Sequence, residues 1–139
     1  MITPRNQKHI YRWVLLRHID SPDDLAGIHF DLLLEDQEFC RTWRLLDIPQ
    51  LDGSYVDAVY IAPHKLEWLD VKAKALSGNR GHAMRIKQGI FLRPLPKAQN
   101  SNINLSLEWE GVEVDLTINK KGCRIIRKKS NYFLKHRRT

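Results

Sequence analysis

Cysteine is scarce in this sequence, which holds only Cys40 and Cys123 among its 139 residues. The two lie far apart and show no paired spacing typical of a zinc site or a disulfide framework, so we expect two small core residues. Long apolar runs are also missing. No stretch approaches the roughly 18 apolar residues of a membrane span, and residues 1–9 lack the apolar region of a secretory signal. These absences argue against disulfide-rich and membrane classes and favour a cytoplasmic protein.

Acidic residues are outnumbered by basic ones. The chain has 23 Lys and Arg against 16 Asp and Glu, a formal net charge of +7. Such an excess favours polyanionic partners, nucleic acid above all, because bound cations release counterions from the polyanion. The length fits one domain over residues 1–139. We expect its basic ends, residues 1–9 and 129–139, to be flexible, although the C-terminal arm can also serve as a phosphate clamp.

Helical periodicity is almost absent, and alternation of apolar and polar residues dominates. The expected strands are residues 11–18, 29–35, 39–46, 56–61, 66–75, 83–91, 103–109, 112–118 and 123–127. Asp36-Gln37 and Glu110-Gly111 are typical of tight hairpin turns. Pro63 should separate two strands, because proline cannot pair inside a central strand.

One short segment has the features of a helix start. Ser21 is a capping residue, Pro22 suits the first helical position, and two aspartates follow before Gly27 ends the segment. With the strands, this predicts a mainly β fold: a small closed antiparallel β-barrel of about eight strands, with one short helix and surface loops.

The first candidate site is the His29-Phe30-Asp31 segment. On a strand, residues i and i+2 face the same side, so the imidazole and the carboxylate can converge on one cation. His18, at the end of the preceding strand, can supply a third ligand. Two imidazoles and a carboxylate suit Mn, Fe or Zn better than Ca or Mg. The alternative is a His and an Asp that only hydrogen-bond each other at the mouth of a barrel.

Three further features are candidates for contacts with a phosphate or a base. His64 follows Pro63 and can act as a general acid or bind a phosphate oxygen, unless it is an ordinary loop histidine. The turn at residues 77–82 carries Arg80 and can hold a phosphate with its amides, or simply connect two strands. Most tryptophans should be core residues, but Trp68, close to His64, can stack on a base or ribose.

Taken together, these motifs resemble the 3'-phosphoesterase domain of bacterial DNA ligase D. RH at residues 17–18, HFDLLLE at 29–35 and RTWRL at 41–45 are similar to the family's KH, HYDFRLE and SWAVPKG. HKLEWLDV at 64–71 is similar to HPLEYADF, and the SGNRG turn with its following strand resembles a glycine-rich turn and a WDRGTW-like strand. GCRIIR at 122–127 resembles the ending G-x-W-x-L-V-R. The similarity runs over residues 13–127, and the order and spacing of the motifs make it specific.

The resemblance implies a small barrel that acts on the 3' ends of DNA or RNA in DNA repair. Such a domain removes a 3'-phosphate or a 3'-terminal ribonucleoside, and a ligase or polymerase is a plausible partner. The resemblance also implies a divalent ion, Mn first and Zn second, held by His18, His29 and Asp31. The ion would activate a water and neutralise phosphoryl oxygens. His64 would contact the phosphate and either stabilise the developing charge or protonate the leaving oxygen.

The sequence departs from the family at two positions that contact phosphate. Leu33 stands where the family has the arginine of HYDFR, and Trp68 stands where it has the tyrosine of HPLEY. Losing a hydrogen bond from a charged group costs about 1.5–3 kcal/mol unless another residue replaces it. Arg17, Arg44 and Arg80 are the candidates for that replacement.

Two other functions remain open from the sequence. Leu33 and Trp68 favour a non-catalytic nucleic-acid-binding barrel that keeps the fold and the charge without turnover. Alternatively, His29 and Asp31 with His64 or His82 can form the facial triad of a non-haem iron oxygenase.

Overall fold

The structure is a computed structural model that describes residues 9–19, 27–76 and 81–129. The described part is almost entirely strands joined by turns and loops. The elements in chain order are β1 (Tyr11–Ile19), β2 (Ile28–Glu35), β3 (Phe39–Leu45), β4 (Ala58–Lys65), the 3-10 turn η1 (Leu66–Asp70), β5 (Ala73–Ala75), β6 (His82–Phe91), β7 (Ile103–Trp109), β8 (Val112–Asn119) and β9 (Gly122–Arg127).

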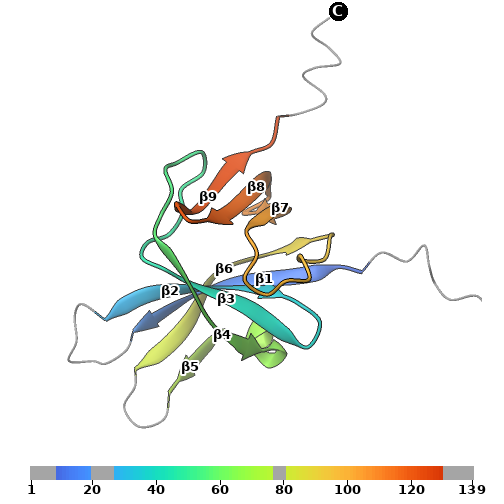
Figure 1. Ribbon diagram of the computed structural model, residues 1–139. Helices are drawn as coiled ribbons and strands as arrows, with labels where there is room; N and C mark the ends of the chain where they lie inside the picture. Colours follow the sequence, from blue (N-terminus) through green and yellow to red (C-terminus); the bar gives the residue numbers. More distant parts are fainter. Residues whose placement is uncertain (1–8, 20–26, 77–80, 130–139) are drawn as a thin grey trace, which may run out of the picture.

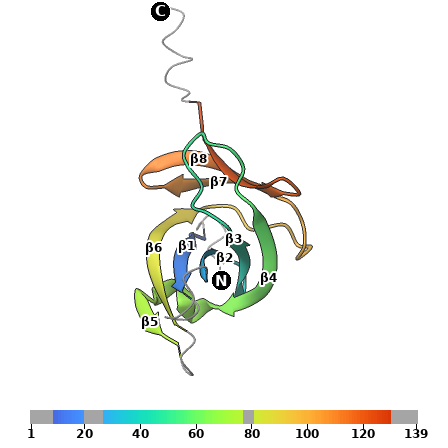
Figure 2. The ribbon, with the colours of Figure 1, turned by 90° about the vertical axis from the view of Figure 1, so that its left-hand side faces the viewer.

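The strands form one antiparallel sheet in the order β4-β3-β2-β1-β6-β7-β8-β9, with β5 paired to β6. The sheet is curled into a half-barrel, so the prediction of a closed barrel is wrong (Figures 1 and 2). Its end strands β4 and β9 do not pair along their length. Instead, β9 meets the segment before β4 through isolated bridges, Val56 with Cys123 and Leu51 with Ile125.

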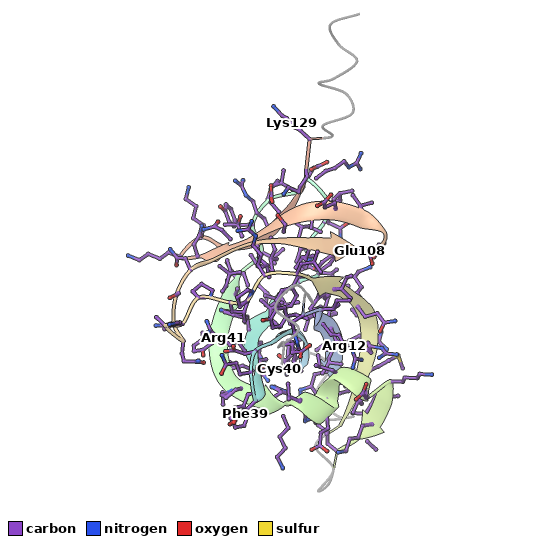
Figure 3. All side chains as sticks on the ribbon, turned by 90° about the vertical axis from the view of Figure 1, so that its right-hand side faces the viewer. Arg12, Phe39, Cys40, Arg41, Glu108 and Lys129 are labelled. Carbon is purple, nitrogen blue, oxygen red and sulfur yellow. The ribbon has the colours of Figure 1, made fainter. Side chains whose placement is uncertain are left out.

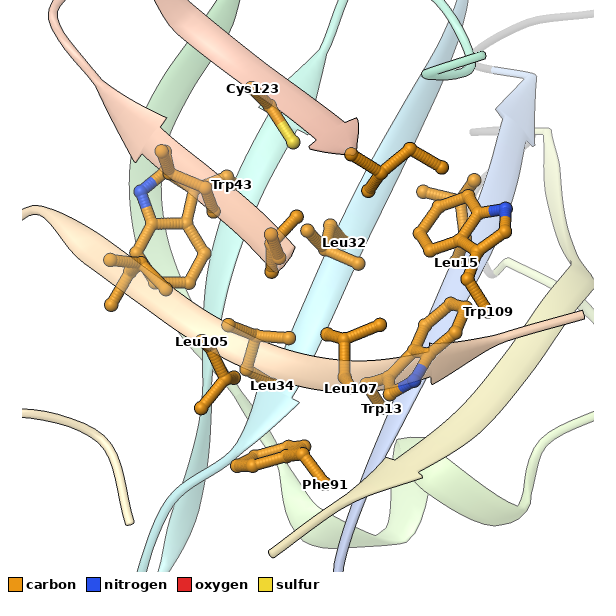
Figure 4. Close-up of a cluster of buried hydrophobic side chains, with 14 of the residues drawn as sticks. Trp13, Leu15, Leu32, Leu34, Trp43, Phe91, Leu105, Leu107, Trp109 and Cys123 are labelled. Atoms are coloured by element: carbon orange, nitrogen blue, oxygen red, sulfur yellow. The ribbon is translucent and has the colours of Figure 1, made fainter. Parts of the chain in front are cut away.

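A sharp bend in the sheet explains the open shape. β6 and β7 share a single register pair, Phe91 with Leu107, so β7, β8 and β9 turn away from the other strands and lie across one face of them (Figures 1 and 2). The main core fills the space between these layers. Trp13 of β1 stacks on Trp109 of β7 with ring centroids 4.5 Å apart, and leucines of both layers surround the pair (Figure 4).

A second, smaller core lies on the opposite face of the sheet. Val14 and Leu16 of β1, Leu33 of β2 and Cys40 of β3 pack there against Leu69 of η1. Successive residues of a strand face opposite sides, which is why Trp13 and Leu15 belong to the main core and Val14 and Leu16 to the second one.

Two arginines fasten η1 over the second core. Arg12 of β1 donates to the backbone carbonyl of Leu69 over 2.7 Å and pairs with Asp70 over 2.8 Å. Arg85 of β6 donates to the same carbonyl over 3.3 Å. A short turn that satisfies few of its own carbonyls is therefore fixed by side chains of the sheet.

Arg41 is buried on the other side of β3, where only 2% of it is exposed. It pairs with Asp36 over 2.8 Å and donates to the backbone carbonyls of Pro96 and Ala98, so it holds the loop between β6 and β7 against the sheet (Figure 3). Because each of its three nitrogens donates to a group of the chain itself, Arg41 is a structural arginine.

Two expectations about the elements are wrong. Residues 66–75 were expected to form one strand, but they form η1 followed by the short strand β5. Pro63 does not interrupt a strand either, since it lies inside β4. It is tolerated because β4 is the edge strand of the sheet, where a missing N–H costs no ladder hydrogen bond. The expected helix at Ser21 lies outside the described residues.

The expectation that both cysteines are core residues is confirmed. Cys40 and Cys123 are free and fully buried, and burial raises the pKa of each thiol to about 12. Within the described residues, no helix is long and apolar enough to cross a membrane.

Candidate metal and phosphate site

Three side chains of β1 and β2 converge on the face of the sheet that carries the second core. His18 lies directly opposite His29 in the β1–β2 register. Asp31 follows His29 by two residues and therefore faces the same side. This face is fixed by the neighbouring apolar residues Leu16 and Leu33, which pack into the second core one step further along each strand.

The donor atoms of these three residues form a compact group. Nδ1 of His18 and Nε2 of His29 are 2.8 Å apart, and each of the three residues offers a ligand atom within 4.8 Å of the others. His29 and Asp31 are buried, with 8% and 3% of their surfaces exposed. The group can therefore hold a cation in a largely desolvated place.

Arg44 of β3 reaches the carboxylate of this group from the next strand. It lies opposite Asp31 in the β2–β3 register, and its Nε donates to Oδ1 of Asp31 over 3.1 Å. The side chain of Arg44 is 42% exposed. A guanidinium in this position neutralises the buried carboxylate and still has N–H groups that can reach a ligand.

His64 of β4 approaches Asp31 from the far side of β3. Its Nε2 lies 4.0 Å from Oδ2 of Asp31, and its Nδ1 lies 3.0 Å from the hydroxyl of Thr42. Burial lowers the pKa of His64 below its ordinary value of 6.5, and this effect exceeds the opposing effect of the Asp31 carboxylate. His64 is therefore neutral at pH 7.

His18, Asp31, Arg44 and His64 line one cavity of about 250 Å³. Its lining combines polar and apolar side chains: Leu16, His18, Asp31, Arg44, His64, Trp68, Leu76 and Ala83. Trp68 of η1 meets His64 edge to face with centroids 5.6 Å apart. The ammonium of Lys74 lies 5.1 Å from the centre of the Trp68 ring, at cation–π distance.

The donor set fits a borderline transition metal. Histidine nitrogens and a carboxylate oxygen bind zinc or manganese at about 2.0–2.2 Å, which places two ligand atoms of one ion roughly 3–4.4 Å apart. The three residues meet this requirement after small side-chain rotations, because their atoms lie within 4.8 Å of one another. Two imidazoles in the set disfavour calcium and magnesium.

Not every candidate from the sequence reaches the cavity. Arg17 faces the opposite side of β1 from His18, and its register partner Phe30 packs against the main core. His82 lies at the start of β6 opposite Ile19 and does not line the cavity. Arg80 lies outside the described residues. Arg44 is therefore the one of the three candidate replacements that the structure places beside Asp31.

Thr42 was not among the candidate residues from the sequence. Strand alternation does place it on the same face as Arg44, two residues later on β3. Without the register between β3 and β4, however, nothing in the sequence connects Thr42 with His64.

No family model matches the chain, and no curated protein matches it.

Proposed function

We propose that this protein is a metal-dependent phosphoesterase that processes the 3' ends of DNA or RNA. The observation that carries the proposal is the grouping of His18, His29 and Asp31, two of which, His18 and Asp31, line a cavity together with Arg44 and His64. The resemblance to the phosphoesterase domain of DNA ligase D and the net charge of +7 agree with a nucleic-acid substrate.

In this proposal His18, His29 and Asp31 hold the ion, with manganese as the first candidate and zinc as the second. When bound, the ion activates a water and neutralises phosphoryl oxygens. Asp31 supplies negative charge to the ion and also accepts from Arg44, so it orients both the cation and the guanidinium.

Arg44 takes over the task of the arginine that the chain lacks at residue 33. Leu33 is fully buried in the second core and cannot touch a phosphate. The guanidinium of Arg44 instead enters the cavity from the neighbouring strand. A planar guanidinium binds two phosphate oxygens at once, so one arginine can restore the lost contact.

Trp68 provides an apolar wall in place of the family's tyrosine. Its indole lines the cavity beside His64, and an indole ring stacks on a base or ribose rather than hydrogen-bonding a phosphate oxygen. We assign Trp68 to contacts with the terminal nucleoside. The processed end then feeds a ligase or polymerase, which requires a free 3'-hydroxyl.

One observation favours a second function, a nucleic-acid-binding module without turnover. Arg44 already pairs with Asp31, and this contact reduces the negative charge available to a cation. A module of this kind would bind nucleic acid in a salt-dependent manner and ignore divalent ions.

A cleavage assay separates the two functions. A primer–template that ends in a 3'-phosphate or a single 3'-ribonucleotide is incubated with wild type, His29→Ala and Arg93→Ala in Mn, Zn or Mg. Arg93 lies in the loop after β6, away from the lining of the cavity, so Arg93→Ala is the matched control. We expect Mn-dependent release of the 3' group by wild type and Arg93→Ala but not by His29→Ala. Salt-sensitive binding without turnover in any metal would instead establish the binding module.

A further inference from the structure

Thr42 is a buried polar residue next to the proposed site that no ligand-binding role explains so far. It lies in the middle of β3, opposite Leu33 on one side and Ile61 on the other, and none of its surface is exposed. Valine has the same shape and suits a strand as well. A hydroxyl at such a place is costly unless it makes hydrogen bonds, so its partners indicate its purpose.

The hydroxyl of Thr42 has two partners in the structure. It donates to the backbone carbonyl of Cys40 over 3.0 Å, and it lies 3.0 Å from Nδ1 of His64. A hydroxyl has one proton to give and two lone pairs to accept with. Because the proton goes to the carbonyl, which can only accept, Nδ1 of His64 must donate to the hydroxyl oxygen.

A neutral imidazole carries a proton on only one of its two nitrogens, and the contact with Thr42 assigns that proton to Nδ1. Its second nitrogen, Nε2, then has a lone pair on the side of Asp31, 4.0 Å from Oδ2, in a ring that lines the cavity.

We propose that Thr42 is a positioning residue that holds His64 in its Nδ1–H form, so that Nε2 accepts a hydrogen bond from a water bound in the cavity. This water is the one that hydrolysis of a phosphoester consumes, and to that extent the inference rests on the proposed function. A phosphate oxygen has no proton to offer, so Nε2 in this form is matched to an O–H donor. This differs from the role that the resemblance implies for His64, which is to contact the phosphate.

The test uses a matched pair of variants. Thr42→Ser keeps the hydroxyl, and Thr42→Val keeps the shape without it. Long-range ¹H–¹⁵N spectra report which ring nitrogen of His64 carries the proton, independently of any activity. We expect the Nδ1–H form in wild type and Thr42→Ser, and its loss in Thr42→Val. A wild-type ring with its proton on Nε2, or a Thr42→Val spectrum equal to that of wild type, would overturn the role of Thr42.

Steady-state kinetics test whether Nε2 of His64 binds the water that is consumed in hydrolysis. With a 3'-phosphate on a deoxyribonucleotide end and on a ribonucleotide end, Thr42→Val should lower kcat about tenfold on both, the effect of one lost hydrogen bond. KM should stay unchanged, and Thr42→Ser should keep the wild-type kcat. A loss confined to the ribonucleotide end would mean that His64 meets the substrate hydroxyl, which overturns the assignment to water. If wild type cleaves neither substrate, the assignment of Nε2 to the hydrolytic water and the proposed function are both overturned. The spectra would still decide the role of Thr42.

Discussion

Asp31 lies close to each of the other charged or histidine side chains of the site. It is 3% exposed, accepts from Arg44, lies 4.0 Å from His64 and belongs to the group with both histidines of β1 and β2. A buried carboxylate needs such partners, because an unpaired charge in the interior is costly. Its partners are therefore the residues at which substitutions should separate binding of the ion from binding of the phosphate.

Arg44→Gln should separate these two functions. Removal of the guanidinium deletes the proposed phosphate contact, and we expect kcat/KM to fall about 10- to 100-fold, mostly through KM, since a charged hydrogen bond contributes about 1.5–3 kcal/mol. Affinity for Mn should stay equal or rise, because Asp31 loses a competing cation. Steady-state kinetics and isothermal titration measure the two effects. A parallel loss of Mn binding would show that Arg44 stabilises the structure of the site and does not act by binding the phosphate.

His64 predicts a pH dependence of stability. Its pKa is lowered in the folded chain from 6.5, mainly by burial. Below pH 6.5 the unfolded chain takes up a proton at this histidine while the folded chain does not, so acid favours unfolding; above pH 6.5 both states are neutral and the effect vanishes. Between about pH 7.5 and 5.5, with a chelator present, wild type should lose more unfolding free energy than His64→Gln. Equal losses in urea titrations would contradict the lowered pKa.

At the scale of elements, alternation in the sequence predicted most strands well. The β7–β8 hairpin is an example: its strands alternate strictly, and Glu110 and Gly111 both have positive φ, 51° and 78°, as a two-residue turn of this kind requires. The alternation of Leu66 and Trp68 predicted a strand in the same way. There it failed, because Leu66 and Leu69, three residues apart, pack together on the second core as a 3-10 turn does.

The site could be predicted only in part. That His29 and Asp31 share a face follows from strand periodicity alone. That Arg44 meets Asp31 and His64 meets Thr42 follows from the β2–β3 and β3–β4 registers, and the second of these contains an irregularity between Cys40 and Thr42. A shift of one residue moves every side chain of a strand to the other face. No sequence pattern specified that irregularity, so the partners of Asp31 and His64 could not be derived from the sequence.

The packing of η1 on β2 predicts the outcome of Leu33→Arg, the substitution that would rebuild the family's motif. Leu33 is fully buried under η1, so an arginine there would be an unpaired charge in an apolar layer, and the free energy of unfolding should fall by about 3–5 kcal/mol. Leu33→Met, which keeps volume and polarity, should cost less than about 1.5 kcal/mol. Urea denaturation measures both. A stable and more active Leu33→Arg variant would contradict the burial of residue 33 in an apolar layer under η1.

At the scale of the whole molecule, the open half-barrel depends on the contact between β9 and the segment before β4. Gly122 opens β9 with φ +120°, and a Cβ atom there would collide with the carbonyl oxygen of Val56. The adjacent bridge joins Val56 and Cys123 through two hydrogen bonds of 2.8 Å. This contact, rather than continuous pairing, brings the two ends of the sheet together.

Gly122→Ala should therefore destabilise the protein strongly, by more than about 2 kcal/mol, since it combines a strained φ with a backbone collision. Gly111→Ala is the control, because its φ is also positive, +78°, while the space around it is open; it should cost only about 1 kcal/mol. Thermal unfolding compares the two. Equal losses of unfolding free energy in the two variants would show that the close approach of Gly122 to Val56 adds nothing to the stability of the fold.

A manganese titration followed by electron paramagnetic resonance tests most directly whether His18, His29 and Asp31 form one metal centre. Free Mn²⁺ gives a strong signal that is lost on binding, so the titration counts sites. We expect one tight site per chain in wild type and Cys123→Ser, and no tight site in His29→Ala or Asp31→Asn, with the fold of both intact. Undiminished Mn²⁺ binding in His29→Ala and Asp31→Asn would contradict the metal centre. A wild type that binds neither Mn²⁺ nor Zn²⁺ would contradict it as well.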